Sequence, residues 1–237
     1  MTERNPRTNK VIAFAGNQYT TRDCMQELIE NGYKISHLIN IGPGSSSDGI
    51  SGHADLKPFA KKNTIELYRP CTYSLKNASD RRHILALEID LLIVIGWQRL
   101  IPDWFLNSLS IGAFGMHGSS EPLPKGRGRS PLNWSLIENK SCFLTHLFKY
   151  NTGVDAGDIV DAQWFDIYWN DTIETLHLKN MTAQKRLLLK HLPDILSGTA
   201  QYTPQPDNVE PTYYPKRTPE DGRIDWDKTS GEIYNLV

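Results

Sequence analysis

Short apolar runs alternate with amphipathic segments along the first half of the chain. The apolar runs predict strands, and apolar residues at helical spacing between them predict helices. The expected strands lie at 10–16, 33–41, 64–68 and 90–96, and the expected helices at 20–31, 57–62 and 80–87. The run DLLIVIG at 90–96 is apolar almost throughout, as in a strand that a parallel sheet buries on both faces. Alternating strands and helices predict an α/β domain.

The second half continues with longer elements and then changes in composition. Strands are expected at 110–116, 142–150 and 159–167, and helices at 131–138 and about 172–196. From 198 to 227 the chain is rich in Pro, Thr, Tyr and charged residues, which predicts a linker over the surface. A further helix begins in DKTSGEIYNLV without a stop signal. We therefore expect a catalytic domain at 1–197, then a linker and the start of a truncated C-terminal region at 198–237.

Charge and composition exclude several classes of protein. Lys and Arg total 26 against 27 Asp and Glu, a net charge of −1 in 237 residues, which argues against a dominant nucleic-acid partner. The longest apolar run, Leu91–Ile95, is far shorter than the roughly 20 residues of a membrane span. The polar start MTERNPRTNK lacks the apolar core of a secretory signal. Three widely separated cysteines fit a reducing compartment. We expect a cytoplasmic protein.

Two glycine-rich loops invite comparison with phosphate-binding motifs. Gly42-Pro43-Gly44 opens a Gly/Ser loop that we expect to be mobile, but the loop does not lead into a helix as a dinucleotide site requires. Residues 126–130, GRGRS, lack the GK[ST] ending of a P-loop. Neither loop is therefore read as a nucleotide-phosphate site.

His117 and Asp155 carry the clearest catalytic signal. His117 directly follows an expected strand, and ligands bind at the carboxyl ends of strands in parallel α/β sheets. Its imidazole can exchange protons near neutral pH. Asp155 lies in a loop between two strands, 38 residues after His117, and such a loop could fold back toward it. The competing interpretation is a structural histidine at a strand end and an aspartate that only forms a turn.

Other chemistries fit the same residues less well. Asp155 and Asp158 with His117 could ligate a metal, but no third or fourth ligand has a fitting spacing. Ser119 and Ser120 lack the GxSxG context of a hydrolase nucleophile. His37 and His146 lie on expected strands, and His83, His177 and His191 lie on helices. These five histidines are read as structural or surface residues.

The string HGSSEPLPKGRGRSP (117–131), followed by a strand and then VDAGDI (154–159), resembles the catalytic core of the formyltetrahydrofolate-dependent formyltransferases. That family includes methionyl-tRNA formyltransferase, glycinamide ribonucleotide transformylase and the sugar N-formyltransferases. The likeness runs from the first strand to the long helix and is most specific over about 50 residues. It implies a Rossmann-like α/β domain with a mostly parallel twisted sheet. The segment PTYYPKRTPEDGRIDW (211–226) also resembles the family's linker to a smaller C-terminal domain.

The resemblance assigns roles residue by residue. It implies that His117 and Asp155 are catalytic and that Gly115 stands where the family has an Asn that holds the formyl oxygen. Gln98, Asn133 or protonated His117 could supply the missing donor. The donor N10-formyltetrahydrofolate would bind largely through main-chain groups of two segments. These are Trp97, Gln98, Arg99, Leu100 and Ile101, and Thr152, Gly153 and Val154 with Asp155.

The reaction implied is acyl transfer to a primary amine, in which His117 donates to the oxyanion and Asp155 holds His117 charged. The acceptor implied is a nucleotide-linked amino sugar, as in lipopolysaccharide or O-antigen biosynthesis, with Lys125, Arg127 and Arg129 contacting an acceptor phosphate. Three alternatives remain. One is methionyl-tRNA formyltransferase, with tRNA as the partner. Another is a folate-binding homologue without transfer activity, because Gly115 replaces the Asn. The third is an unrelated α/β enzyme that imitates the motif, and such an enzyme would not bind reduced folates.

Overall fold

The computed structural model describes residues 10–44 and 49–237. The polar N-terminal stretch at 1–9 and part of the Gly/Ser loop, at 45–48, lie outside the described residues, so the expectations about them are not addressed. Contacts between residues divide the chain into two compact units. Of the described residues, unit 1 comprises 10–44, 49–115, 149–152 and 188–201, and unit 2 comprises 116–148, 153–187 and 202–237.

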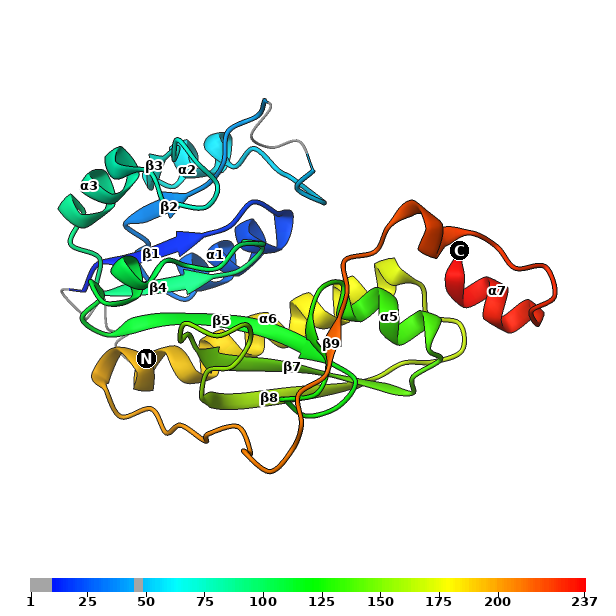
Figure 1. Cartoon of the computed structure of the whole chain (residues 1–237). Helices are drawn as coiled ribbons and strands as arrows, with labels where there is room; N and C mark the ends of the chain where they lie inside the picture. Colours follow the sequence, from blue (N-terminus) through cyan, green and yellow to red (C-terminus); the bar gives the residue numbers. More distant parts are fainter. Residues whose placement is uncertain (1–9, 45–48) are drawn as a thin grey trace. The chain divides into compact units, whose positions relative to one another are not determined.

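Unit 1 contains four short parallel strands, which Figure 1 shows side by side. Their order is β3-β2-β1-β4, and each neighbouring pair is parallel. The strands are β1 (Ile12–Ala15), β2 (His37–Ile39), β3 (Glu66–Tyr68) and β4 (Leu91–Val94). The helices between them are α1 (Tyr19–Glu30), α2 (Lys57–Lys62), α3 (Ala78–Ala86) and α4 (Asp103–Leu106).

The core of unit 1 explains why the apolar runs could be recognised in the sequence. Every residue of β1 and β4 is buried. Phe105 of α4 is fully buried, and Trp97, just beyond β4, is 7% exposed in the same cluster. Full burial of one large apolar side chain contributes about 1.5–3 kcal/mol. These central strands therefore anchor the segment that follows β4.

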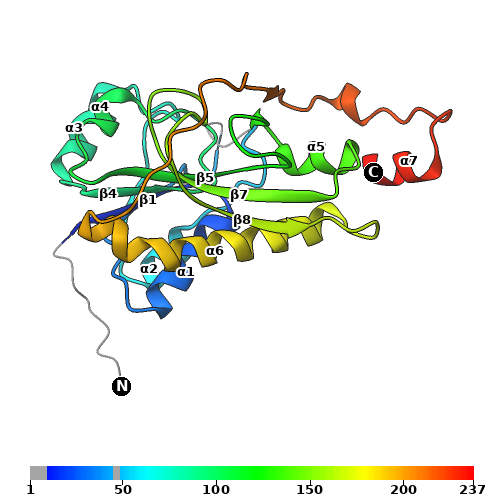
Figure 2. The same ribbon diagram turned by 90° about the horizontal axis from the view of Figure 1, so that it is seen from below.

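Unit 2 is built on an antiparallel pair of longer strands. β7 (Cys142–Lys149) pairs with β8 (Ile159–Asp166), and the 25-residue helix α6 (Ile173–Ser197) follows, with its residues up to 187 in unit 2 and those from 188 in unit 1. Figure 2 shows the first part of α6, drawn in yellow, beside these strands. Fully buried Leu176 of α6 packs in one cluster with Phe143 of β7. α5 (Pro131–Ile137), α7 (Ser230–Leu236) and a short 3₁₀ helix (Pro219–Gly222) complete its helices.

A two-residue parallel pairing joins distant parts of unit 2. β6 (Arg127–Gly128) pairs with β9 (Tyr213–Tyr214), which lies in the stretch expected to be a surface linker. The sequence did not predict this pairing, because neither segment shows strand periodicity. At least part of the linker stretch is therefore tied to the body of unit 2.

The strand β5 (Gly112–Ser119) contributes its first four residues to unit 1 and its last four to unit 2. It pairs in parallel with β4, and the seven-stranded sheet has the order β3-β2-β1-β4-β5-β7-β8. The predicted α/β fold with a mostly parallel sheet is confirmed. The boundary expected between 197 and 198 stays a prediction, since the two units are each assembled from several stretches of chain.

Element boundaries differ from the sequence predictions at a few places. The strand expected over 33–41 is reduced to His37–Ile39, and the four-residue helix α4 was not predicted.

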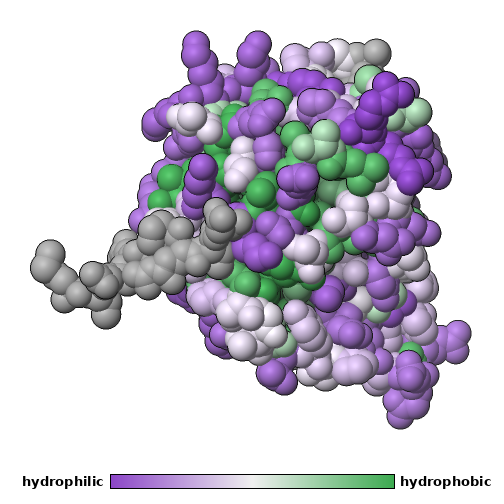
Figure 3. Space-filling model, turned by 90° about the vertical axis from the view of Figure 1, so that its left-hand side faces the viewer, coloured by the Kyte–Doolittle hydropathy of each residue, from purple (hydrophilic) through white to green (hydrophobic). Residues whose placement is uncertain are grey.

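On the face in Figure 3, hydrophilic side chains project and apolar residues lie between them. Among the described residues, no helix combines the length and the apolar character needed to cross a membrane.

Candidate active site

His117 lies near the end of β5, and its imidazole is 9% exposed. Its Nδ1 is 3.4 Å from Oδ2 of Asp155, and its Nε2 is 2.8 Å from the carbonyl oxygen of Gly126. A carbonyl can only accept, so Nε2 carries the hydrogen of that bond. Nδ1 faces a carboxylate, which accepts a second hydrogen from the ring when the ring is protonated. The structure thus brings the two residues expected to be catalytic into one ion pair.

Asp155 is held by both its side chain and its backbone. Its φ of 48° lies in the left-handed region, which non-glycine residues rarely adopt and which Asp tolerates better than most. Its Oδ2 accepts a hydrogen bond of 3.0 Å from the backbone N–H of Gly128. Residues in sparsely populated backbone conformations concentrate at functional sites, where surrounding contacts hold them. The carboxylate therefore has a defined position beside His117.

The loop between β5 and α5 supplies one wall of this centre. Gly128 has a φ of 104°, and a Cβ added there would overlap the carbonyl oxygen of Tyr214 in β9. The backbone of β6 thus approaches β9 more closely than any side chain would allow. The N–H of Gly126 also donates to Oγ1 of Thr212, at 2.8 Å. Residues 212–214 therefore fix the carbonyl and N–H groups that His117 and Asp155 use.

Gln205 links the two sides of the centre. It is 9% exposed, and its Nε2 donates to the carbonyl oxygens of Asp155 at 2.8 Å and Gly157 at 2.9 Å. Its Oε1 accepts from Nη2 of Arg127 at 2.6 Å. Arg127 is 8% exposed and also donates from Nη1 to the hydroxyl of Tyr213. Its expected contact with an acceptor phosphate stays a prediction, while in the structure its guanidinium holds the Asp155 loop through Gln205.

His146 of β7 holds the backbone of His117 through a hydrogen bond. It is 1% exposed, its Nδ1 donates to the carbonyl oxygen of His117 at 3.2 Å, and its Nε2 accepts from the N–H of Leu123 at 3.4 Å. One donor and one acceptor match the neutral imidazole. Burial lowers the pKa of His146 to about 4. A neutral His146 therefore joins the strand end to the loop that follows it.

The segment after β4, expected to bind the donor, lies in unit 1. The hydroxyl of Tyr73 accepts a 2.7 Å hydrogen bond from the N–H of Gln98, and Tyr73 packs edge-on against Trp97 at 4.7 Å between ring centroids. Ile101 is 4% exposed, whereas Leu100 is 54% exposed. The guanidinium of Arg99 lies over the ring of Tyr73, 5.0 Å from its centroid. Among the described residues, the buried Nε1 of Trp97 has no hydrogen-bond partner.

The other predicted site residues range from exposed to buried. Thr152, Gly153 and Val154 are exposed. Lys125 and Arg129 are half-buried on either side of the Gly126–Gly128 loop, and Asn133 is half-buried on α5. Gly115 is buried in β5, two residues before His117, so the alternation of a strand gives the two positions the same face.

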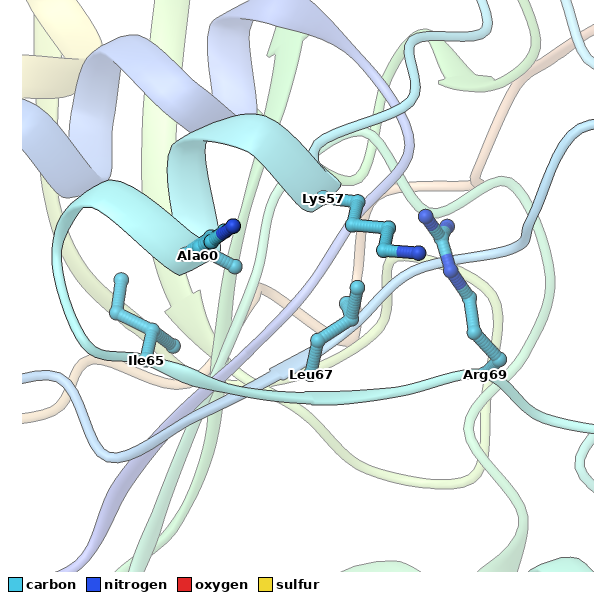
Figure 4. A pocket seen from close by; sticks show the side chains of 6 residues that line it. Lys57, Ala60, Ile65, Leu67 and Arg69 are labelled. Carbon is cyan, nitrogen blue, oxygen red and sulfur yellow. The ribbon is translucent and has the colours of Figure 1, made fainter.

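A separate hollow of about 390 Å³ lies in unit 1 beside α2 and β3 (Figure 4). Its lining residues are Lys57, Ala60, Lys61, Ile65, Leu67 and Arg69. Arg69 is engaged by the carboxylate of Asp55 and the side chain of Asn40. None of the expected site residues lines it. Within the stretch that the structure describes, no three His, Cys, Asp or Glu side chains gather as a metal site would need.

Two contributors to the centre were missed from the sequence: Gln205 and Thr212. Gln205 and Thr212 lie in the stretch expected to be a linker, 50 and 57 residues beyond Asp155, and nothing in their local sequence marks them. His146 was expected to be a structural or surface residue, and its contacts with the backbone groups of His117 and Leu123 are structural. His146 had one usable signal. It is a histidine within the apolar strand CFLTHLFKY, where a polar side chain requires a hydrogen-bond partner.

A family model described as formyl transferase matches residues 9–192 of the chain. Among solved structures, an N-formyltransferase from Helicobacter canadensis, in complex with folinic acid and dTDP-3-aminofucose, is similar. It is 20% identical with a TM-score of 0.70, over 96% of this chain and 79% of that one. WlaRD, a sugar 3N-formyl transferase in the presence of dTDP and 5-N-formyl-THF, is 21% identical with a TM-score of 0.71. The match covers 97% of this chain and 78% of that chain.

A third similar structure is HypX from Aquifex aeolicus in complex with tetrahydrofolic acid. It is 16% identical with a TM-score of 0.67, and the match covers 97% of this chain and 34% of that chain. At such identities the likeness establishes the fold.

Proposed function

The chain belongs to the formyl transferase family, and on that premise we propose that it transfers a formyl group from N10-formyltetrahydrofolate to the primary amine of a nucleotide-linked amino sugar. The observation that carries the proposal is the ion pair of His117 and Asp155 near the end of β5. An imidazole and a carboxylate so placed can accept and return a proton during acyl transfer. The reduced folates and amino sugar in the similar structures support the choice of substrates.

The donor would bind at residues 97–101, with residues 152–154 as its second contact. The buried, unpartnered Nε1 of Trp97 supports a ligand there, because an unmet buried donor costs free energy that a ligand acceptor would remove. The exposed side chain of Leu100 would cover apolar ring atoms of the donor.

In the reaction, the acceptor amine attacks the formyl carbon, and a tetrahedral intermediate with a negatively charged oxygen forms. The bond from the formyl carbon to N10 then breaks, and a proton from the amine ends on N10. Protonated His117 would donate to the oxygen, and Asp155 would keep the ring oriented. To reach the substrate, Nε2 must exchange the Gly126 carbonyl for the substrate oxygen.

For the acceptor, we assign Lys125 and Arg129 to a phosphate of the nucleotide, because both flank the loop that bears the centre. Arg127 would act by holding Gln205. A formylated sugar nucleotide would serve lipopolysaccharide or O-antigen biosynthesis. The near-neutral charge of the chain supports this acceptor over a tRNA.

The test is an assay of tetrahydrofolate release from N10-formyltetrahydrofolate with a panel of nucleotide-linked amino sugars and, separately, charged initiator tRNA. We expect release that requires one amino sugar and that falls at least 100-fold in His117→Ala. Release of tetrahydrofolate with charged initiator tRNA and with no amino sugar would identify the tRNA as the acceptor in place of the sugar. Donor binding without release for any acceptor would identify a non-catalytic homologue, and no binding of reduced folate would overturn the proposal.

A further inference from the structure

The space beside Gly115 is already filled by another side chain. A Cβ built at Gly115 would overlap Cε2 of Tyr150 and would lie 2.9 Å from its Cζ and its hydroxyl oxygen. Gly115 is not among the residues with positive φ, so its backbone would accept any residue. Glycine at position 115 is therefore required by the ring of Tyr150 and not by the conformation of β5.

Tyr150 is held in this position by its backbone and its ring. It directly follows β7, and its N–H donates to the carbonyl oxygen of Ala113 at 2.8 Å. Its half-buried ring packs against the core cluster of unit 1. The phenolic oxygen thus has a defined place where a side chain at position 115 would begin.

We propose that Tyr150 supplies the hydrogen-bond donor that an Asn at position 115 would otherwise supply, and that its hydroxyl donates to the formyl oxygen as that oxygen becomes negatively charged. The inference rests on the proposed function. Position 115 shares a face of β5 with His117. A phenol and an amide are both neutral donors suited to an oxyanion. The donor would then come from Tyr150, which directly follows β7, and not from position 115.

The decisive variant is Tyr150→Phe, which keeps the ring and removes only the hydroxyl. Removing one oxyanion donor costs about 100–1000-fold in kcat. We expect that loss, with KM for the donor changed less than about threefold because the ring still packs. Tyr234→Phe, in the exposed part of α7, is the matched control and should leave kcat unchanged. Circular dichroism and thermal unfolding establish that both variants fold.

A swap tests the shared space. Gly115→Ala should lower kcat because its methyl group displaces the Tyr150 ring, and Gly115→Asn in a Tyr150→Ala background should transfer at least tenfold faster than Tyr150→Ala alone. An active wild type whose Tyr150→Phe variant keeps its kcat overturns the role of Tyr150 and leaves the proposed function standing. A wild type that transfers nothing to any amine overturns both.

Discussion

Residues 97–101 and the His117–Asp155 pair are held in place by different kinds of contact. The first segment follows a buried strand, and Trp97 and Ile101 are anchored in the apolar core of unit 1. The His117–Asp155 pair depends on polar contacts from three separate stretches, at 126–128, 155–157 and 205–214. Apolar burial tolerates small changes of position, whereas a hydrogen bond loses most of its strength when its geometry shifts. The proposed binding surface and the proposed catalytic centre therefore tolerate shifts in atomic position to different degrees.

Asp155→Asn should lower turnover at the His117–Asp155 pair without weakening donor binding at residues 97–101. The amide oxygen can still accept from Gly128, but the charge that faces Nδ1 of His117 is lost. We expect kcat to fall by about 100–1000-fold, in the range typical of proton-transfer catalysis, with donor affinity retained. Asp207→Asn, at an exposed position of unit 2, is the matched control. Loss of donor binding in Asp155→Asn would contradict the proposal that residues 97–101 bind the donor and that His117 and Asp155 catalyse the transfer.

The neutral state of His146 should make folding stability depend on pH. Its pKa of about 4 lies below the ordinary value of 6.5, so its contribution is complete above pH 6.5 and is lost as the pH falls toward 4. At about 1.4 kcal/mol per pH unit, the loss amounts to about 3 kcal/mol. Urea unfolding from pH 7.5 to 4 should show it, and His146→Asn should flatten the dependence.

His177 has a pKa lowered by burial as well, so His146→Asn should retain part of the slope. His191→Asn, at a half-buried position of α6, serves as the comparison. If the free energy of unfolding of His146→Asn depends on pH as steeply as that of the wild type, His146 does not contribute to the pH dependence.

Gln205→Ala should weaken the centre more mildly. The carbonyl oxygens of Asp155 and Gly157 and the guanidinium of Arg127 would each lose a partner. Buried groups left without partners cost about 1–3 kcal/mol, which a lower Tm would report. We expect kcat to fall about tenfold, since the Asp155 loop loosens without losing its carboxylate. Gln201→Ala, at an exposed position, should leave Tm and kcat unaltered. Equal effects at the two positions would show that the hydrogen bonds of Gln205 do not support the centre.

The sequence predicted the parts of the fold that depend on apolar periodicity. The runs at 10–16 and 90–96 contain buried strands, and the helix at 57–62 has the predicted bounds. It also singled out His117 and Asp155, which the structure pairs. It did not predict the β6–β9 pairing, because two-residue strands carry no periodic signal. Gln205 and Tyr150 act through contacts 50 and 35 residues distant in sequence, and such contacts leave no local pattern.

As proposed above, donor binding and catalysis reside in separable groups of residues. The most direct test measures the donor Kd by titration and kcat at saturating donor for His117→Asn and Trp97→Phe. We predict that His117→Asn binds the donor as the wild type does and transfers at least 100-fold more slowly. Trp97→Phe should raise Kd severalfold, because the buried Nε1 donor is lost, and keep kcat within about threefold. Variants that each lose binding and turnover together would contradict the claim.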